Sequence, residues 1–167
     1  QVWHQGICVA KDGKMCQTIA STTDWTPAKG SVHIPKDITP ESFEIKGFAS
    51  KIRVIGLIPH QLFTDELHVD ASIENGHLIA NHNEDILKLA VVERHHNTGN
   101  IGLGFVHGFN LKNGAIGSTV GHDAHNITVA GDNDRDMCVA VQSLAEVGGG
   151  QCVVQNGVLL AMLPLPI

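Results

Sequence analysis

The sequence predicts an α+β fold, rich in strands, in which mixed sheets with hairpins are covered by few helices. Short apolar runs alternate with Asn-Gly and Asp-Gly dipeptides, and only one stretch spaces its apolar residues as a helix does. Of the 167 residues, 43% are hydrophobic and 17% are charged. This length and composition predict one folded domain, residues 1–167, and exclude a disordered chain.

Hairpins are expected where Asn-Gly or Asp-Gly joins two strand-like runs, because these residues accept the positive φ of a two-residue turn. The three expected hairpins pair residues 6–10 with 15–19, 67–73 with 77–80, and 152–155 with 158–162. Other β-branched or leucine-rich runs bounded by turn residues predict further strands at 43–46, 51–58, 87–93, 115–120 and 126–130.

One helix is predicted after Asp132 or Asn133, either of which can cap its N-terminus. Apolar residues then recur at helical spacing until Gly148, and this face should pack on a sheet. Residues 27–40, rich in Pro, Thr and Lys, predict a long surface connection.

Charge and hydropathy exclude two classes of partner. The formal net charge is −6 and no run of Lys or Arg forms a stripe, so a nucleic-acid partner is not expected. The longest nearly apolar stretch, 157–167, contains two prolines and is about half of the roughly 20 residues that a membrane-spanning helix needs. The residues at both ends of the sequence predict that residues 1–167 are a piece of a longer polypeptide. The four cysteines form no C-x-x-C pair, so a reduced, cytoplasmic setting is expected.

Polar residues concentrate in two segments, 92–100 and 120–126, and each segment follows a predicted strand. The glycine-rich residues between them, 102–109, permit tight turns or a close backbone approach. These glycines do not lead into a helix, so they do not predict a dinucleotide-binding loop.

His122 and His125 form an H-x-x-H pair, whose orientation in a loop the spacing leaves open. Asp123 is suited to orient an imidazole, and Glu93 with His95 offers a second carboxylate and imidazole. A structural interpretation stays open, in which these groups only cap turns, bond backbone amides or form a rim ion pair between Glu93 and Arg94.

The order of these residues resembles the C-terminal domain of bacterial adenine deaminase. The resemblance is dense over residues 85–167 and thinner over 2–82. It rests on Val91-Val92-Glu93-Arg94-His95, Thr98-Gly99-Asn100-Ile101-Gly102-Leu103-Gly104-Phe105-Val106-His107-Gly108-Phe109, His122-Asp123-Ala124-His125-Asn126, Gly148-Gly149-Gly150 and Leu163-Pro164-Leu165-Pro166-Ile167.

This resemblance implies a hydrolytic deaminase of the amidohydrolase superfamily, which converts adenine to hypoxanthine and ammonia with a metal-activated water in a β/α barrel. It places the divalent metal, manganese, iron or zinc, in that barrel, so no metal ligand is expected in this chain. The chain departs from the family pattern at Gly121 and Ala124, where Ala and Ser are usual, and at Asn110, where Gly is usual.

We therefore expect the 122–126 loop to project toward the mouth of a barrel in the same polypeptide, with adenine as substrate and a homo-oligomer as the assembly. The expected auxiliary catalytic residues are His122, Asp123 and His125, and the expected substrate-binding residues are Asn126, Glu93, Arg94 and His95. Two alternatives stay open: a structural and oligomerisation module without chemistry, or an autonomous metal-binding domain using His95, His122 and His125.

Overall fold

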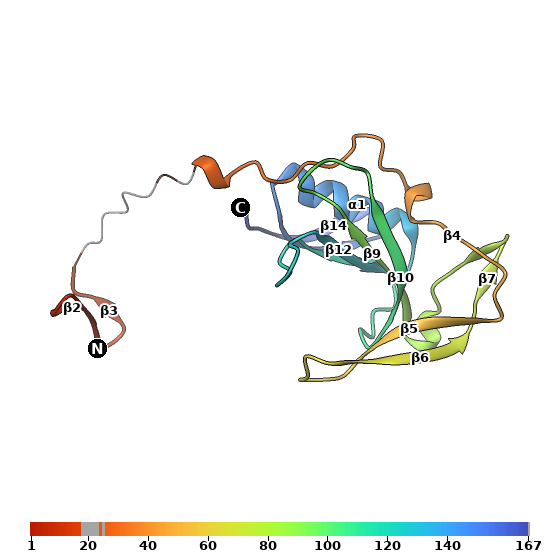
Figure 1. Ribbon diagram of the computed structural model, residues 1–167, viewed down its shortest axis with the longest axis horizontal. Coiled ribbons are helices and arrows are strands. Elements are labelled where there is room, and N and C mark those ends of the chain that lie inside the picture. The colour runs from red at the N-terminus through yellow and green to blue at the C-terminus, as the bar shows by residue number, and fades with distance from the viewer. Residues whose placement is uncertain (18–23, 25, 167) are drawn as a thin grey trace.

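The computed structural model describes residues 1–17, 24 and 26–166 of the chain (Figure 1). The described elements are β1 (Val2–His4), β2 (Ile7–Lys11), β3 (Lys14–Met15), η1 (Thr26–Ala28), η2 (Pro40–Phe43), β4 (Ile45–Lys46), β5 (Lys51–Leu57), β6 (Thr64–Asp70), β7 (Ile73–Glu74), β8 (His77–Leu78), η3 (His82–Glu84), β9 (Ile86–Val92), β10 (Ile101–His107), β11 (Ala115–Ser118), β12 (Ile127–Gly131), α1 (Asp134–Glu146), β13 (Gly150–Gln155) and β14 (Val158–Pro164).

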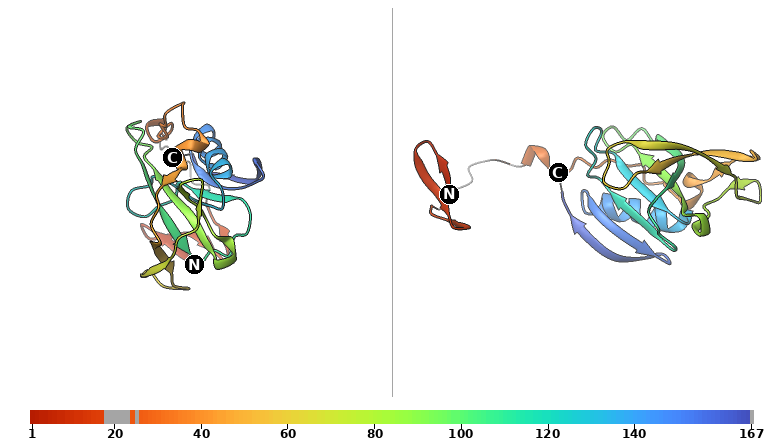
Figure 2. Two further views of the ribbon diagram at one scale, coloured as in Figure 1. Left: turned by 90° about the vertical axis from the view of Figure 1, so that its right-hand side faces the viewer. Right: turned by 90° about the horizontal axis from the view of Figure 1, so that it is seen from below.

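The strands form three sheets. The central sheet has eight strands in the order β14-β13-β11-β12-β9-β10-β5-β6. It is a mixed sheet, because β10 and β5 are parallel and all other neighbouring strands in it are antiparallel. The smaller sheets, β1-β2-β3 and β4-β8-β7, have three strands each, and the first lies apart from the central sheet (Figures 1 and 2). The predicted strand-rich α+β class is confirmed, with α1 as the one α-helix among the described residues.

Two of the three expected hairpins form at their predicted turns. Asp12 and Gly13 connect β2 to β3, and Asn156 and Gly157 connect β13 to β14, all four with positive φ as the turn requires. In the first hairpin β3 ends at Met15, and residues 18 and 19 of the expected run lie outside the described residues.

The expected hairpin of residues 67–73 with 77–80 is wrong for most of its first strand. Asn75-Gly76 does join a hairpin, but it contains only the two-residue strands β7 and β8. Residues 67–70 belong instead to β6, which pairs along its whole length with β5. Alternating polar and apolar residues fit both pairings, so the sequence pattern alone did not separate them.

The glycine-rich residues 102–107 form a strand rather than the tight turns considered from sequence. In β10 a glycine alternates with a larger residue, and the whole strand pairs with β9. A Cβ added at Gly104 would meet no atom within 4 Å, so a close backbone approach does not explain this glycine.

The predicted helix is confirmed as α1. The Asn133 side chain accepts the Asp136 backbone N–H at 2.8 Å and so caps the N-terminus, while Gly148 with φ +79 follows its end. The buried Asp136 carboxylate also accepts the backbone N–H groups of Asn156 (3.0 Å) and Gly157 (2.6 Å). These bonds tie α1 to the β13–β14 turn.

Residues 27–40 are not simply a surface connection. Ile38 is buried in the main core, and its carbonyl accepts the Gln142 side-chain amide of α1 at 3.0 Å. The backbone N–H of His33 bonds the Arg94 carbonyl at 2.7 Å. Apolar residues spaced among the prolines therefore fasten this segment over α1 and beside the loop that follows β9.

The two faces of the central sheet are covered differently. Side chains of α1 pack with Ala90, Val92, Ile127 and Val129 in the main core on one face. On the other face Leu87, Val106 and Ala130 form a separate buried cluster, and Leu89, Leu111 and Ile116 pack against it. No helix in the described part of the chain is both long and apolar enough to span a membrane.

Candidate functional site

The two polar segments meet because their strands are neighbours. Strand β9 ends at Val92, β12 begins at Ile127, and these two residues are directly paired. The loop of residues 93–100 leaves β9 at this edge, and the loop of residues 119–126 enters β12 at the same edge. The structure therefore brings together the two segments that the sequence singled out.

Glu93 organises the first loop from within. Its carboxylate accepts the backbone N–H groups of His95 (2.5 Å), His96 (2.8 Å) and Thr98 (3.0 Å), and the Thr98 hydroxyl at 3.0 Å. The Thr98 backbone N–H is the largest cause of a pKa of Glu93 lowered to about 2. Glu93 is therefore an ionised cap of its own loop, and it bonds the backbone of His95 rather than the ring.

Arg94 connects the two loops. Its side chain is 5% exposed, its Nε donates to the His125 carbonyl, and one terminal nitrogen donates to Ser31 Oγ at 3.4 Å. Burial lowers the pKa of the guanidinium, which nevertheless stays charged in proteins. The position of Arg94 is that of an internal support for the second loop.

His95 makes a second connection of the same kind. Its Nε2 lies 2.7 Å from the Ala124 carbonyl oxygen, so this nitrogen carries the proton and donates it. Arg94 and His95 thus bond consecutive carbonyls of the second loop, those of His125 and Ala124.

His122 and Asp123 lie at the tip of the second loop. His122 Nδ1 is 2.8 Å from Asp123 Oδ1, and their side chains are 100% and 94% exposed. When Nδ1 donates to the carboxylate, the lone pair of Nε2 is free to accept a proton or a hydrogen bond. The expected orienting role of Asp123 thus has a geometric basis, although an exposed pair of this kind is worth little in water.

His125 and Asn126 complete the loop. His125 has a left-handed backbone with φ +50, and its N–H bonds the Gly121 carbonyl at 3.2 Å, which closes a turn. Among the described residues, no hydrogen-bond partner is found for the buried Oδ1 of Asn126. Buried polar atoms in native proteins are nearly always paired, so this oxygen is an acceptor suited to a donor from outside the described residues.

Three residues that were not among the expected site residues, Thr119, Ser31 and Gly149, also hold the site. Thr119 Oγ1 accepts the Gly150 N–H at 2.9 Å, and Ser31 contacts Arg94. A Cβ at Gly149 would lie 2.9 Å from Thr119 Oγ1, so the glycine allows the close approach of these segments. The Gly148-Gly149-Gly150 triplet was the one available signal in the sequence.

The side chains of this site do not form a metal centre. The described residues contain no group of three or more His, Cys, Asp and Glu side chains placed to hold an ion. Two of the three histidines of the autonomous metal-binding alternative have other partners: the His95 ring bonds a carbonyl, and the His122 ring bonds Asp123.

A mixed sheet with one covering helix and two polar loops joined at one edge defines a domain with a candidate site at that edge. The family model for the adenine deaminase C-terminal domain matches residues 61–167, which is more than half of the chain. The chain therefore belongs to the adenine deaminase C-terminal domain family.

Similar full-length proteins extend this result to the first sixty residues. An adenine deaminase 2 of Carboxydothermus hydrogenoformans is 45% identical over 166 residues, 99% of this chain and 29% of that protein. An adenine deaminase of Clostridium botulinum is 45% identical over 97% of this chain, and one of Methanothrix thermoacetophila is 44% identical over all of it. The chain spans 28–29% of the length of these relatives.

Proposed function

We propose that this chain is the C-terminal domain, residues 1–167, of an adenine deaminase that hydrolyses adenine to hypoxanthine and ammonia. The observation that carries the proposal is 41–45% identity, over at least 97% of the chain, to proteins named adenine deaminase. The four cysteines are free thiols, which supports a reduced, cytoplasmic setting.

Deamination at C6 of adenine needs a hydroxide nucleophile, and a divalent metal ion generates one near neutral pH. The donor geometry of the described residues does not fit such an ion. In our proposal its ligands lie in a β/α barrel of the same polypeptide, and the metal is manganese, iron or zinc. In this proposal the residues of this chain do not bind the metal, and residues 1–167 alone are inactive.

The contribution of this chain is the 119–126 loop, placed over the mouth of the barrel. His122, oriented by Asp123, presents Nε2 as an auxiliary proton acceptor or donor near the purine, and His125 shapes the same turn. Asn126 assists binding from the same loop: once the loop opens, its now buried Oδ1 accepts a hydrogen bond from an N–H of the substrate. Glu93, Arg94 and His95 assist binding by holding the loop in position.

A structural and assembly role is the second candidate, and the exposed apolar C-terminal strand favours it. Leu159, Leu160 and Leu163 of β14 and the following Leu165 are all exposed. Such apolar surface is suited to a homo-oligomer interface. Loss of oligomeric mass after deletion of residues 163–167, measured by light scattering, would support this role.

The activity is tested on the full-length protein that contains this chain. We expect equimolar hypoxanthine and ammonia from adenine, no product from adenosine, and loss of turnover after chelation that returns with manganese, iron or zinc. The matched control is residues 1–167 alone under the same conditions. Absence of turnover on adenine in the metal-loaded full-length protein would contradict the proposal.

A further inference from the structure

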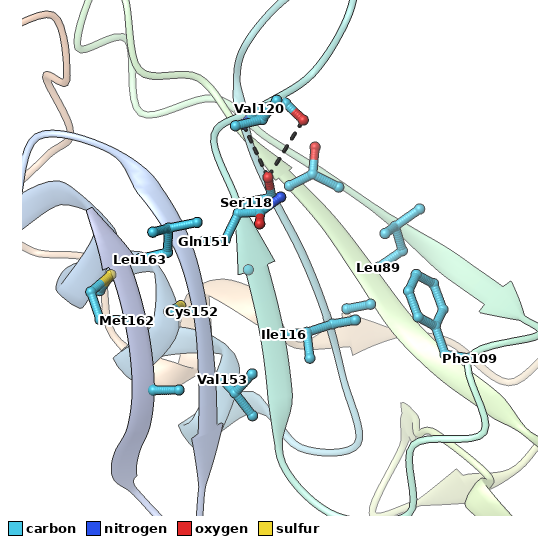
Figure 3. Close-up of a pocket in the computed structure, with 14 residues that line it drawn as sticks. Leu89, Phe109, Ile116, Ser118, Val120, Gln151, Cys152, Val153, Met162 and Leu163 are labelled. Atoms are coloured by element: carbon cyan, nitrogen blue, oxygen red, sulfur yellow. Dashed lines mark hydrogen bonds between the residues drawn. The ribbon is translucent and has the colours of Figure 1, made fainter. Parts of the chain in front are cut away.

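A large apolar hollow lies on the face of the central sheet opposite α1 (Figure 3). It measures about 600 Å³, and Ile116 and Val153 lie in its floor between Leu89 with Phe109 on one side and Leu163 on the other. None of its fourteen lining residues carries a charge, although the chain has 11 basic and 17 acidic residues. The charged residues therefore lie outside this hollow.

The hollow is open to solvent in this chain. Val153 is 38% exposed and Leu163 54%, and Phe109 and Val120 on its border are exposed as well. An exposed contiguous apolar patch on a protein with a net charge of −6 marks a surface that another structure covers. The β10–β11 connection, with Leu111 packed on Leu87, closes only one end of this face.

The hollow is continuous with the candidate site. Val120 lines its upper end, and Ser118 Oγ fixes this residue by accepting its N–H at 3.0 Å and bonding its carbonyl at 3.4 Å. His122 follows two residues later in the same loop. The loop that carries the His122–Asp123 pair therefore starts at the border of the hollow.

We infer that the hollow is the docking surface for an apolar segment of the catalytic portion of the same polypeptide. The curated relatives carry about 70% of their length outside the matched region, so a large structure of the same molecule is available to cover it. The inference rests on the proposed function, because it takes that portion to be the deaminase barrel. A second copy on this face would cover the sheet without bringing a catalytic portion to the loop.

Photo-cross-linking in the full-length protein tests the inference. With Val153→p-benzoylphenylalanine, we expect an adduct that keeps the mass of one chain on a denaturing gel, with the linked peptide lying outside residues 1–167. Leu62→p-benzoylphenylalanine, at a 99% exposed position in the β5–β6 turn, is the matched control and should give no such adduct. An adduct of doubled mass, or one to a peptide within residues 1–167, would overturn the inference.

Thiol labelling provides a second measurement that does not need the bulky probe. We expect maleimide to label Val153→Cys at least about tenfold more slowly than Leu62→Cys, because labelling of a covered thiol waits for local opening. Equal rates would overturn the inference. Adenine turnover is assayed on the same preparations, so a protein that docks but does not act on adenine refutes the proposed function while leaving the docking surface intact.

Discussion

The loop after β9 and the loop after β11 lie at one edge of the sheet but are built in opposite ways. The first turns its charged groups inward: Glu93 bonds four donors of its own loop, and the buried Arg94 reaches across to the second loop. The second turns its charged groups outward, where His122 and Asp123 contact each other and solvent. One loop is a support, and the other presents the chemistry.

The largest effect on stability is expected from removing the central support. Arg94→Met removes a buried guanidinium and leaves the His125 carbonyl without its donor, and a hydrogen bond that involves a charged group contributes about 1.5–3 kcal/mol. The melting temperature of the full-length protein should fall clearly, and adenine turnover with it. Arg53→Met, at an exposed position of β5, is the control. Equal melting temperatures for the two variants would show that Arg94 is not a support.

A smaller, pH-dependent effect is expected for Glu93→Gln. The pKa of Glu93 is lowered from 4.5 to about 2, so its ionised form stabilises the folded state above pH 4.5 and loses this contribution as the pH falls toward 2. The variant should melt a few degrees below the wild type at neutral pH, and the difference should close in acid. Exposed Glu84→Gln is the control, and a difference independent of pH would exclude this role.

The smallest effect on stability is expected for Asn126→Ala, because its buried oxygen has no partner to lose among the described residues. The KM for adenine should instead rise about threefold to tenfold, which is the value of one hydrogen bond. Steady-state kinetics and thermal melting separate these readouts, with exposed Asn83→Ala as control. A lower melting temperature with an unchanged KM would make Asn126 structural.

Local chemistry made much of the fold predictable. Asp12-Gly13 and Asn156-Gly157 specify their turns through positive φ, and Asn133 with Gly148 bounds α1. Strand β10 was missed because its glycines signal turns, and only the pairing with β9 along its whole length shows why a strand forms there. Residues 93–100, which connect these two strands, contain Asn97 and Gly99 with positive φ, but no Asn-Gly or Asp-Gly dipeptide of the kind that predicted the other hairpins.

The sequence predicted where the site lies better than it predicted what each residue does there. Polar residues that follow two strands indicated the positions of both loops, because ligand-facing groups are common at strand ends. The burial of Arg94 was not predictable, since arginine is mostly exposed and its acceptor, the His125 carbonyl, belongs to a distant segment. Thr119 and Ser31 were missed for the same reason, because neither belongs to a recognisable pattern.

The most direct measurement is kcat of full-length His122→Ala on adenine. The account predicts a fall of about a hundredfold or more, typical for loss of a proton-transfer group, with an unchanged melting temperature. His68→Ala is a closely matched control, since His68 forms an exposed pair with Glu66 at 2.9 Å on β6, and it should keep wild-type kcat. A wild-type kcat for His122→Ala would contradict a catalytic role for the 119–126 loop.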